Sequence, residues 1–341
     1  MYVSIRLIAP NARGAIHALL RSGRDRIGAS IDPIKGSESV RTLTYTADAA
    51  DEGRAIKRII RSKMAVSHGQ LASLKQKNAV LLDGRSVHAN EIVHAGQTIS
   101  LLLEDEAGGV AVPAEGDVNV VYEDEDILIV DKSAPLACMS GVQHPDDALE
   151  NRLAWRYRGE NYVFRPVNRL DKGTSGLMAV AKHAHAQQVL QNMLHTDAYV
   201  REYLALAVGR VEPESGTIDA PIGKADGATV RREVRADGKR AVTHYETVLR
   251  GEDYTLLRVR LETGRTHQIR VHLQHIGHPI AGDFLYGEED ARLPGRFALH
   301  SARLVLTHPV TGERMAFESD APRVFYDMLA AGSAARPDSN V

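Results

Sequence analysis

Apolar residues at helical spacing indicate two short helices in the first third of the chain. In residues 54–77, RAIKRIIRSKMAVSHGQLASLKQK, the first apolar face consists of Ile56, Ile59, Ile60 and Met64. Ser67 is a candidate N-cap for a second helix, which carries Leu71 and Leu74. The segment therefore predicts a pair of helices, each with one buried face.

Short runs of strand-forming residues follow these helices. Val80 to Leu82 precede the turn pair Asp83-Gly84, and the alternating segment TISLLL at 98–103 comes after Gly96. Helices and strands together predict a compact helix-helix-sheet unit over residues 43–104, which is large enough to fold alone.

A change of composition marks the boundary of this unit. Residues 105–117 are rich in Gly and Ala and show no periodicity, so they predict a linker. Beyond it, VNVVYEDEDILIVDK predicts two short strands around the acidic turn 123–126. The segments VTHYETVL, YTLLRVRL and LVLTHPVTGERMAF predict further strands and a hairpin.

Helices are expected within this strand-rich region at 183–195 and 266–276, the second with Thr266 as N-cap and Gly277 as its stop. The fold class predicted for residues 118–328 is α+β, with a large, mainly antiparallel sheet and flanking helices. Residues 1–42 show no clear pattern and are treated as an unassigned N-terminal extension. Residues 329–341 are expected to form a disordered tail.

Composition agrees with two folded units in one cytoplasmic protein, which we expect to be a monomer. The chain has 341 residues, 43% of them hydrophobic. Its one cysteine, Cys138, cannot form an internal disulfide, which suits a reducing compartment. No apolar run is long enough for a membrane span, and Arg6, Pro10 and Arg13 interrupt the N-terminal segment where a signal peptide needs continuous apolar residues.

The charge distribution is uneven although the net charge is only −2. Residues 54–77 contain no acid, and their cations are Arg54, Lys57, Arg58, Arg61, Lys63, Lys75 and Lys77. Such a run is either an ordinary solvated helical face or a phosphate-binding surface. With its LLDGR turn and its AGQTI entry to the last strand, the unit resembles the S-four type RNA-binding domain, a small α/β domain. The resemblance favours RNA, held through phosphates without selection of a nucleotide.

A candidate for chemistry is the segment RPVNRLDKGTSGLMAVAK, residues 165–182. It places Asp171 between Arg169 and Lys172 and continues into a small-residue loop that ends at Gly176. A neighbouring cation favours an ionised carboxylate, which can act as nucleophile or base, and glycine permits close approach of backbone and substrate. Adjacent Arg and Asp residues also form structural ion pairs, and this stretch alone favours that interpretation.

Three further segments occur in a fixed order after NRLDKGTSG. They are REYLALAVG at 201–209, TGRTHQIRVHLQHIGHPIAGD at 263–283 and FALHSARLVLTHPVTGE at 297–313. In these four segments the chain resembles the RluA family of pseudouridine synthases, over roughly residues 118–325. The resemblance implies a mixed sheet crossed by a cleft, a uridine flipped out of RNA, and isomerisation of its N-glycosidic bond to a carbon–carbon bond.

The resemblance also implies roles for four residues. Asp171 matches the catalytic aspartate, and Arg270 matches the cation that pairs with it. Arg169 matches the arginine that fills the gap left by the flipped base, which offsets part of the unstacking cost. Tyr203 matches the tyrosine that packs on the uracil and is a candidate to take the proton from C5. Whether Asp171 attacks C1′ of the sugar, attacks C6 of the base or removes a sugar proton stays open.

Two segments depart from the family pattern. Asn168 stands where the family usually has His, and DKSAPL at 131–136 replaces the usual NKPAGL. Neither change removes a residue assigned to the chemistry. Both lie beside the expected cleft and bear on the choice of uridine.

No cofactor or metal is expected. The isomerisation involves no net oxidation and transfers no group elsewhere, and the sequence lacks both GxxxxGK[ST] and GxGxxG loops. The nearby histidines lack accompanying Cys or paired carboxylates, so they are expected at the surface or in hydrogen bonds: His267, His272, His275 and His278.

Other enzyme classes fit less well. Ser175 in GTSG lacks the spacing of a GxSxG nucleophile, and DKGT places Gly173 where a phosphoaspartyl enzyme needs a second acid. A non-catalytic RNA-binding protein would be expected to lose Asp171 or its partners. Within the family, an N-terminal S-four type domain is most like enzymes acting on large-subunit ribosomal RNA, with transfer RNA as the alternative. Aromatic residues make up only 5%, which favours recognition of RNA shape.

Overall fold

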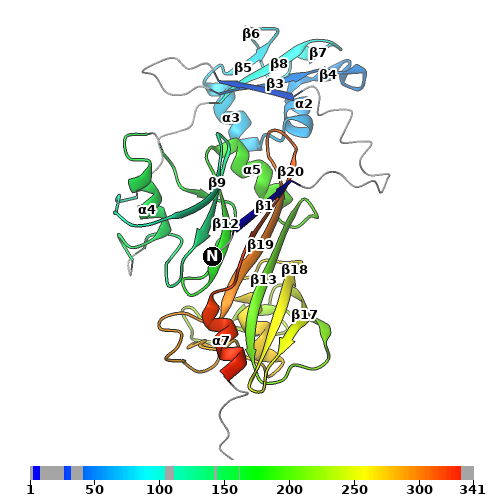
Figure 1. Cartoon of the computed structure of the whole chain (residues 1–341). Coiled ribbons are helices and arrows are strands. Elements are labelled where there is room, and N and C mark those ends of the chain that lie inside the picture. The colour runs from blue at the N-terminus through cyan, green and yellow to red at the C-terminus, as the bar shows by residue number, and fades with distance from the viewer. Residues whose placement is uncertain are drawn as a thin grey trace, which may run out of the picture.

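The computed structural model describes residues 3–7, 27–31, 41–103, 111–141, 144–160 and 162–331. They form a small unit above a larger, elongated one (Figure 1). The small unit contains a five-stranded antiparallel sheet in the order β2-β3-β8-β5-β6. Its strands are β2 (Ile27–Ile31), β3 (Arg41–Thr46), β5 (Val80–Leu82), β6 (Arg85–Ser86) and β8 (Thr98–Leu103), and a separate pair consists of β4 (Arg54–Ala55) and β7 (Ile92–Val93).

The helices of the small unit are η1 (Ala49–Asp51), α2 (Ile56–Lys63) and α3 (His68–Gln76). The apolar face of α2 is buried, with Ile56, Ile59 and Ile60 fully enclosed. Ser67 caps α3 by accepting a hydrogen bond from the Gln70 amide at 3.1 Å. The two predicted helices, the cap and the two predicted strands are therefore confirmed.

The larger unit is built on an eleven-stranded sheet. Its main path runs β14-β17-β18-β13-β19-β12-β10-β9, while β20 and β1 extend it beside β19 and β11 pairs with β12. The bounds are β1 (Val3–Leu7), β9 (Asn119–Glu123), β10 (Ile127–Lys132), β11 (Arg165–Pro166), β12 (Ser175–Ala181), β13 (Tyr199–Val208), β14 (Ser215–Asp219), β17 (Val242–Arg250), β18 (Tyr254–Leu261), β19 (Leu299–Thr307) and β20 (Arg314–Ser319). A two-stranded sheet of β15 (Ile222–Lys224) and β16 (Arg232–Val234) stands apart.

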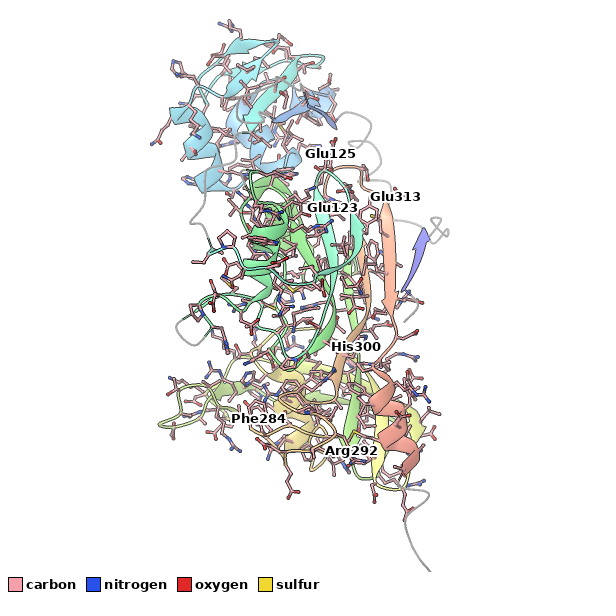
Figure 2. All side chains as sticks on the ribbon, turned by 60° about the vertical axis from the view of Figure 1, so that its left-hand side comes forward. Glu123, Glu125, Phe284, Arg292, His300 and Glu313 are labelled. Carbon is pink, nitrogen blue, oxygen red and sulfur yellow. The ribbon has the colours of Figure 1, made fainter. Side chains whose placement is uncertain are left out.

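Helices cover both faces of this sheet, which gives the predicted α+β architecture. They are α4 (Leu149–Arg156), α5 (Ala184–Met193), α6 (Gln268–His275) and α7 (Arg323–Ala331). Alternate residues of β10 enter different cores: Leu128 belongs to the core that also contains residues of α4, α6 and α7, and Ile129 belongs to the core that contains residues of α5. Figure 2 shows Glu123, Glu125 and Glu313 at the end of the sheet nearest the small unit.

One junction of this sheet is parallel, and it lies directly after Asp171. Ser175 and Gly176 of β12 align with His300 and Ser301 of β19. Gly176 has φ +108°, and a Cβ atom there would lie 2.3 Å from the Ser301 carbonyl oxygen. The glycine is thus required for close approach of two backbones, which anchors the end of the Asp171 loop.

Several details differ from the sequence-based expectations. The N-cap of α6 is His267, with φ 59°, and not Thr266, although Gly277 ends the helix as predicted, with φ 85°. The extension assigned no element contains β1, which pairs with β20, and β2, which pairs with β3. Strands of five residues are short for a periodicity argument, and β1 also depends on a partner more than 300 residues away, which local periodicity does not reveal.

The predicted linker and tail were only partly correct. Residues 104–110 and 332–341 lie outside the described residues, whereas the second half of the linker is fastened to α4, where Asn151 Nδ2 donates to the Val112 carbonyl at 2.8 Å. Helix α7 extends to Ala331, so the predicted tail boundary at 329 falls within it. Among the described residues, no helix is both long and apolar enough to cross a membrane.

Candidate active site

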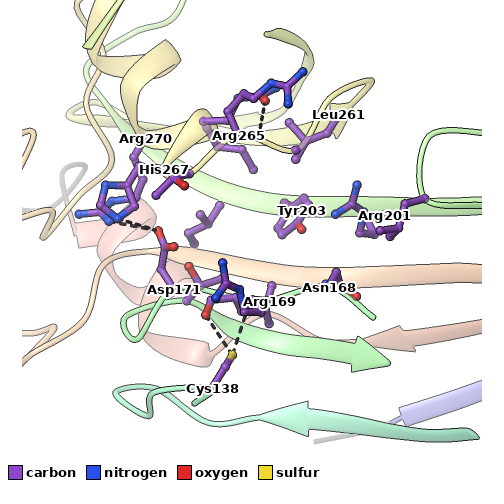
Figure 3. Close-up of a pocket in the computed structure, with 18 of the residues that line it drawn as sticks. Cys138, Asn168, Arg169, Asp171, Arg201, Tyr203, Leu261, Arg265, His267 and Arg270 are labelled. Atoms are coloured by element: carbon purple, nitrogen blue, oxygen red, sulfur yellow. Dashed lines mark hydrogen bonds and ion pairs between the residues drawn. The ribbon is translucent and has the colours of Figure 1, made fainter. Parts of the chain in front are cut away.

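A cavity of about 420 Å³ opens between the Asp171 loop, β13 and the start of α6. Its lining contains all four residues singled out for chemistry: Arg169, Asp171, Tyr203 and Arg270 (Figure 3). These side chains come from three separate segments of the sequence. The order of the strands in the sheet therefore creates the cavity.

Asp171 is paired with a distant cation and not with its sequence neighbours. Arg270 Nη1 lies 3.1 Å from Asp171 Oδ2, and His267 Nε2 lies 3.9 Å from the same oxygen. Lys172 instead donates to His144, and Arg169 is exposed, with Nη1 3.7 Å from the Met139 sulfur. The interpretation of Arg169 and Asp171 as a local ion pair is therefore wrong, while the pairing with Arg270 is present.

Asp171 keeps one carboxylate oxygen unengaged. Both basic groups approach Oδ2, and within the described part of the chain Oδ1 has no hydrogen-bond partner. The side chain retains 30% of its exposure. This geometry leaves Oδ1 available to a molecule in the cavity.

Arg270 is clamped from behind by Asp283, a residue that the sequence analysis assigned no role. Arg270 Nε and Nη2 donate to the two Asp283 oxygens at 2.7 and 2.8 Å, and Asp283 is fully buried. Burial lowers the pKa of Arg270, but the hydrogen bonds and charge of Asp283, together with the Asp171 charge, raise it overall. Asp283 is the only acid in residues 263–283, which is the signal that could have identified it.

Two aromatic rings pack against the guanidinium of Arg270. Its guanidinium lies 4.1 Å from the Phe297 ring centroid and 4.9 Å from that of Tyr286. Such contacts and the two-point clamp hold the planar group in one orientation. Arg270 therefore presents its remaining nitrogen to Asp171.

Tyr203 projects from β13 into the cavity and is 5% exposed. Burial raises the pKa of Tyr203, the Asp171 charge acts in the same direction, and Arg201 lowers it in part. The raised pKa keeps the hydroxyl protonated at neutral pH. An aromatic face beside Asp171 is suited to stacking on a planar base.

Lys132 holds the loop of residues 131–136, which departs from the family pattern, through hydrogen bonds to backbone carbonyls. Its ammonium donates to the Leu136 and Ser133 carbonyls at 2.7 and 3.0 Å, and Leu136 N–H donates to the Lys172 carbonyl at 3.0 Å. Burial lowers the pKa of Lys132 to about 8. These bonds tie residues 131–136 to the Asp171 loop, a support that no sequence motif indicated.

The histidines near α6 are hydrogen-bonded or exposed, as predicted. His272 is buried between Thr243 Oγ1 and the Ala220 carbonyl, His278 Nδ1 bonds to the Val208 carbonyl, and His275 is exposed. His267 Nδ1 bonds to the Tyr286 hydroxyl at 2.8 Å. None of them lies in a group of metal-ligand residues within the described structure.

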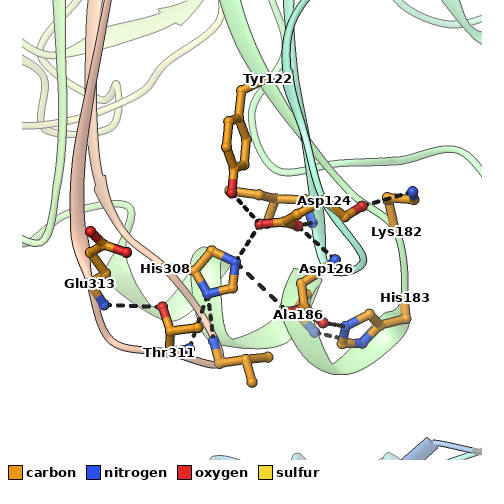
Figure 4. Close-up of polar contacts among 11 residues, drawn as sticks. Tyr122, Asp124, Asp126, Lys182, His183, Ala186, His308, Thr311 and Glu313 are labelled. Carbon is orange, nitrogen blue, oxygen red and sulfur yellow. Dashed lines mark hydrogen bonds and ion pairs between the residues drawn. The ribbon is translucent and has the colours of Figure 1, made fainter. Parts of the chain in front are cut away.

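One cluster of potential ligands does exist, at the turn between β9 and β10 (Figure 4). The ligand atoms of Asp124, Asp126 and His308 lie within 4.8 Å of one another. His308 Nδ1 accepts backbone N–H groups of Thr311 and Val310, so its proton is on Nε2, which donates to Asp124 at 2.9 Å. Because neither ring nitrogen offers a free lone pair, we assign no metal to this cluster.

The cations of the small unit face a second cavity, of about 910 Å³. Five of the seven predicted cations line it, together with Gln188 and Asn192 of α5: Arg54, Lys57, Arg58, Arg61 and Lys75. Lys63 and Lys77 do not. A third cavity, of about 800 Å³, shares His195 and Arg265 with the Asp171 cavity and is also lined by Arg240 and Arg260. Cations thus line cavities beside the second half of α5 and just beyond its C-terminus.

Comparisons with known proteins agree with this site. Residues 126–275 match a family model described as RNA pseudouridylate synthase, a range that includes Asp171, Tyr203 and Arg270. The ribosomal large subunit pseudouridine synthase D of Pseudomonas aeruginosa is 39% identical, over 77% of this chain and 87% of that protein. YjbO of Bacillus subtilis, described as an uncharacterized RNA pseudouridine synthase, is 36% identical over 71% of this chain and 86% of its own.

Solved structures give the same fold. The structure titled human RNA Pseudouridylate Synthase Domain Containing 1 aligns with a TM-score of 0.51 and 26% sequence identity. The alignment covers 63% of this chain and 86% of that one.

Proposed function

Because the chain belongs to the RNA pseudouridylate synthase family, we propose that it isomerises specific uridines in the ribosomal RNA of the large subunit. The family reaction converts uridine in RNA to pseudouridine, which makes this protein an isomerase. The choice of ribosomal RNA is supported by relatives named for the large ribosomal subunit, including those of Pseudomonas aeruginosa and Xanthomonas campestris. With that substrate, the proposal places a monomeric enzyme in the cytoplasm.

The observation that carries the catalytic assignment is the contact between Asp171 and the clamped Arg270. Asp283 fixes Arg270, Arg270 holds Oδ2 of Asp171, and Oδ1 remains open to the cavity. A carboxylate fixed in this way loses little freedom when it engages a substrate, which is how preorganised sites lower barriers. The reaction moves the sugar from N1 to C5 of one ring, so it requires no redox cofactor or ATP.

Two further roles are proposed from position and exposure. Arg169 is exposed at the rim of the cavity, where its side chain can occupy the place of the flipped base. Tyr203 lies in the cavity with a raised pKa, which supports packing of its ring on the uracil more directly than proton removal by its hydroxyl.

We also propose that residues 43–104 are an S-four type RNA-binding domain. Five of its cations line one cavity that also includes α5 of the larger unit, so the domain presents its positive face next to the catalytic domain. Phosphate contacts there would strengthen binding without reading sequence. Removing this domain should weaken binding to long structured RNA, and turnover of saturating substrate should persist.

Pseudouridine mapping on total RNA tests the activity and the target together. Cells that lack the protein are compared with cells carrying either the wild type or the Asp171→Ala variant, using a uridine-specific adduct read by primer extension. Loss of defined sites in large-subunit RNA, restored only by the wild type, would support both assignments. Loss of sites in transfer RNA would redirect the substrate, and restoration by Asp171→Ala would contradict the catalytic role.

A further inference from the structure

His267 occupies an unusual position beside Asp171. It is the N-cap of α6, with φ 59° and ψ 20°, a left-handed conformation that few residues other than glycine adopt. Such backbone conformations are concentrated at functional sites. Arg270 follows three residues later on the same helix, and both side chains line the Asp171 cavity.

The hydrogen bonds of Tyr286 determine which nitrogen of His267 carries the proton. The backbone N–H of Arg232 donates to the Tyr286 oxygen at 2.9 Å, so the tyrosine hydrogen is directed to His267 Nδ1 at 2.8 Å. The two rings meet edge to face, with centroids 5.6 Å apart. An imidazole that accepts at Nδ1 carries its hydrogen on Nε2.

The Nε2 hydrogen of His267 is left without an acceptor. Asp171 Oδ2, at 3.9 Å, is beyond hydrogen-bond distance, and no other described residue accepts from this nitrogen. The charged groups around the ring are Asp171, Arg270, Asp283 and Arg232, and burial lowers the pKa of His267. A donor that is 10% exposed and unpaired indicates a partner that arrives with the substrate.

The position of Asp171 restricts which substrate atom that donor can reach. If the carboxylate acts at C1′ or on a proton of C2′, the carbon atom that it approaches lies within two bonds of N1. The carbonyl oxygen O2 of the uracil also lies two bonds from N1. In these two versions of the reaction, a donor beside the carboxylate is therefore suited to O2 and much less to O4 on the far side of the ring, whereas attack at C6, three bonds from each carbonyl oxygen, would favour neither.

On the basis of the proposed function, we propose that His267 Nε2–H donates a hydrogen bond to O2 of the flipped uridine. The bond holds the base against Asp171. When the N1–C1′ bond breaks, its electron pair stays with the uracil, and the hydrogen bond stabilises the resulting negative charge on O2. The His267 proton is not transferred; the C5–C1′ bond then forms, C5 loses its proton and N1 gains one.

The test combines variants of His267 with a substrate altered at O2. The RNA carries the uridine identified by mapping, either as uridine or as 2-thiouridine, whose sulfur is a weaker acceptor. His267→Asn suits the left-handed backbone but is too short to place a donor at Nε2. We expect its kcat to fall about 10- to 100-fold, the range for a hydrogen bond to a charged group. His267→Gln, which reaches further, should recover part of the loss.

The decisive readout is the rate penalty for 2-thiouridine. It should be large in the wild type and nearly absent in His267→Asn, because the interaction is already lost. His275→Asn is the matched control, since His275 is exposed on the same helix and outside the cavity. Its rate and its 2-thiouridine penalty should stay within about twofold of the wild type, as expected for a surface substitution.

If His267→Asn fails to fold, Tyr286→Phe provides the second route. It removes the donor to Nδ1, so the ring populates both tautomers and the 2-thiouridine penalty should fall. Equal penalties in the wild type and in a folded, active His267→Asn protein would overturn this inference alone. A folded wild type that converts no uridine in any RNA would overturn the proposed function, and this inference with it.

Discussion

Two aspartate–histidine contacts in this molecule have similar partners and different geometry. At the turn after β9, His308 Nε2 lies 2.9 Å from Asp124, and His308 Nδ1 accepts two backbone N–H groups. In the cavity, His267 Nε2 lies 3.9 Å from Asp171, and Asp171 Oδ1 has no described partner. In the first contact both ring nitrogens of the histidine are hydrogen-bonded. In the second, one carboxylate oxygen and the Nε2 hydrogen have no described partner.

This difference separates groups that hold the fold from groups available to a substrate. Asp124 receives further hydrogen bonds from Tyr122 and from the amides of Asp126 and Ile127 (Figure 4). Near Asp171, the group with complete hydrogen bonding lies behind the carboxylate, where Asp283 holds Arg270. The cavity thus combines a rigid support with unpaired polar atoms that face a substrate, which is the arrangement that preorganised sites require.

The largest expected effect is on turnover. Asp171→Asn should lower kcat at least about a thousandfold, because removal of a catalytic carboxylate eliminates the chemical step. The free energy of unfolding should change by less than about 1 kcal/mol, since the ion pair is partly exposed. RNA affinity should stay within a few-fold. Single-turnover assays and chemical denaturation measure these quantities, and retained turnover would contradict the catalytic assignment.

The next largest effect is expected at the support of the site. Asp283→Asn leaves the buried Arg270 without its main counter-charge, which should reduce the free energy of unfolding by about 3 to 5 kcal/mol and also lower kcat. Asp237→Asn is a matched control, because Asp237 makes the same two-point contact with Arg235 at the surface, at 2.6 and 3.1 Å. It should leave the free energy of unfolding nearly unchanged, because both side chains are solvated. Equal losses in the two variants would mean that burial does not determine the difference.

The hydrogen-bonded cluster around Asp124 should contribute to the free energy of unfolding without affecting kcat. Burial raises the pKa of Asp124, but hydrogen bonds from His308, the Ile127 and Asp126 amides and Tyr122 hold it well below its usual range. A lowered pKa stabilises the fold above the ordinary value of 3.8, and the contribution is lost as the pH falls below it.

Asp124→Asn should therefore cost about 1.5 to 3 kcal/mol at pH 7, the range for hydrogen bonds to a charged group, and the cost should shrink below pH 3.8. Denaturation curves at several pH values measure it. A cost independent of pH would show that the ionised form is not what these hydrogen bonds stabilise. At temperatures well below unfolding, kcat should be unchanged.

The smallest effect is expected from solvated cations of the small unit that form no ion pair within the described structure. Arg58 and Arg61 line the cavity next to α5 and make no ion pair within the described structure. Changing both to Gln should weaken RNA binding a few-fold and reduce the slope of log affinity against log salt by about 1.5, for two lost phosphate contacts. Arg323→Gln, on α7 at the opposite end of the molecule, is the control (Figure 1). An equal change in the double variant and in Arg323→Gln would argue for non-specific charge effects.

Local elements could be predicted because their signals are local. The helical face of α2, the Ser67 cap, the Asp83-Gly84 turn and the alternating strands all depend on backbone preferences within a few residues. The N-cap of α6 was misassigned to Thr266 because the left-handed conformation of His267 goes with a bond to Tyr286, a residue outside the helix. The strand β1 was missed for a similar reason, since it is paired with β20 at the other end of the chain.

The sequence by itself determined the secondary-structure pattern, the order of four motifs and hence the family, with Asp171, Tyr203 and Arg270 as the residues to inspect. Only the tertiary structure decided that Arg270, and not Arg169 or Lys172, contacts Asp171, that Asp283 fixes Arg270 and that His267 presents a free donor. Arg270 lies 99 residues from Asp171 in the chain. Contacts over such separations depend on how strands are ordered in the sheet, and hydrophobic periodicity carries no information about that order.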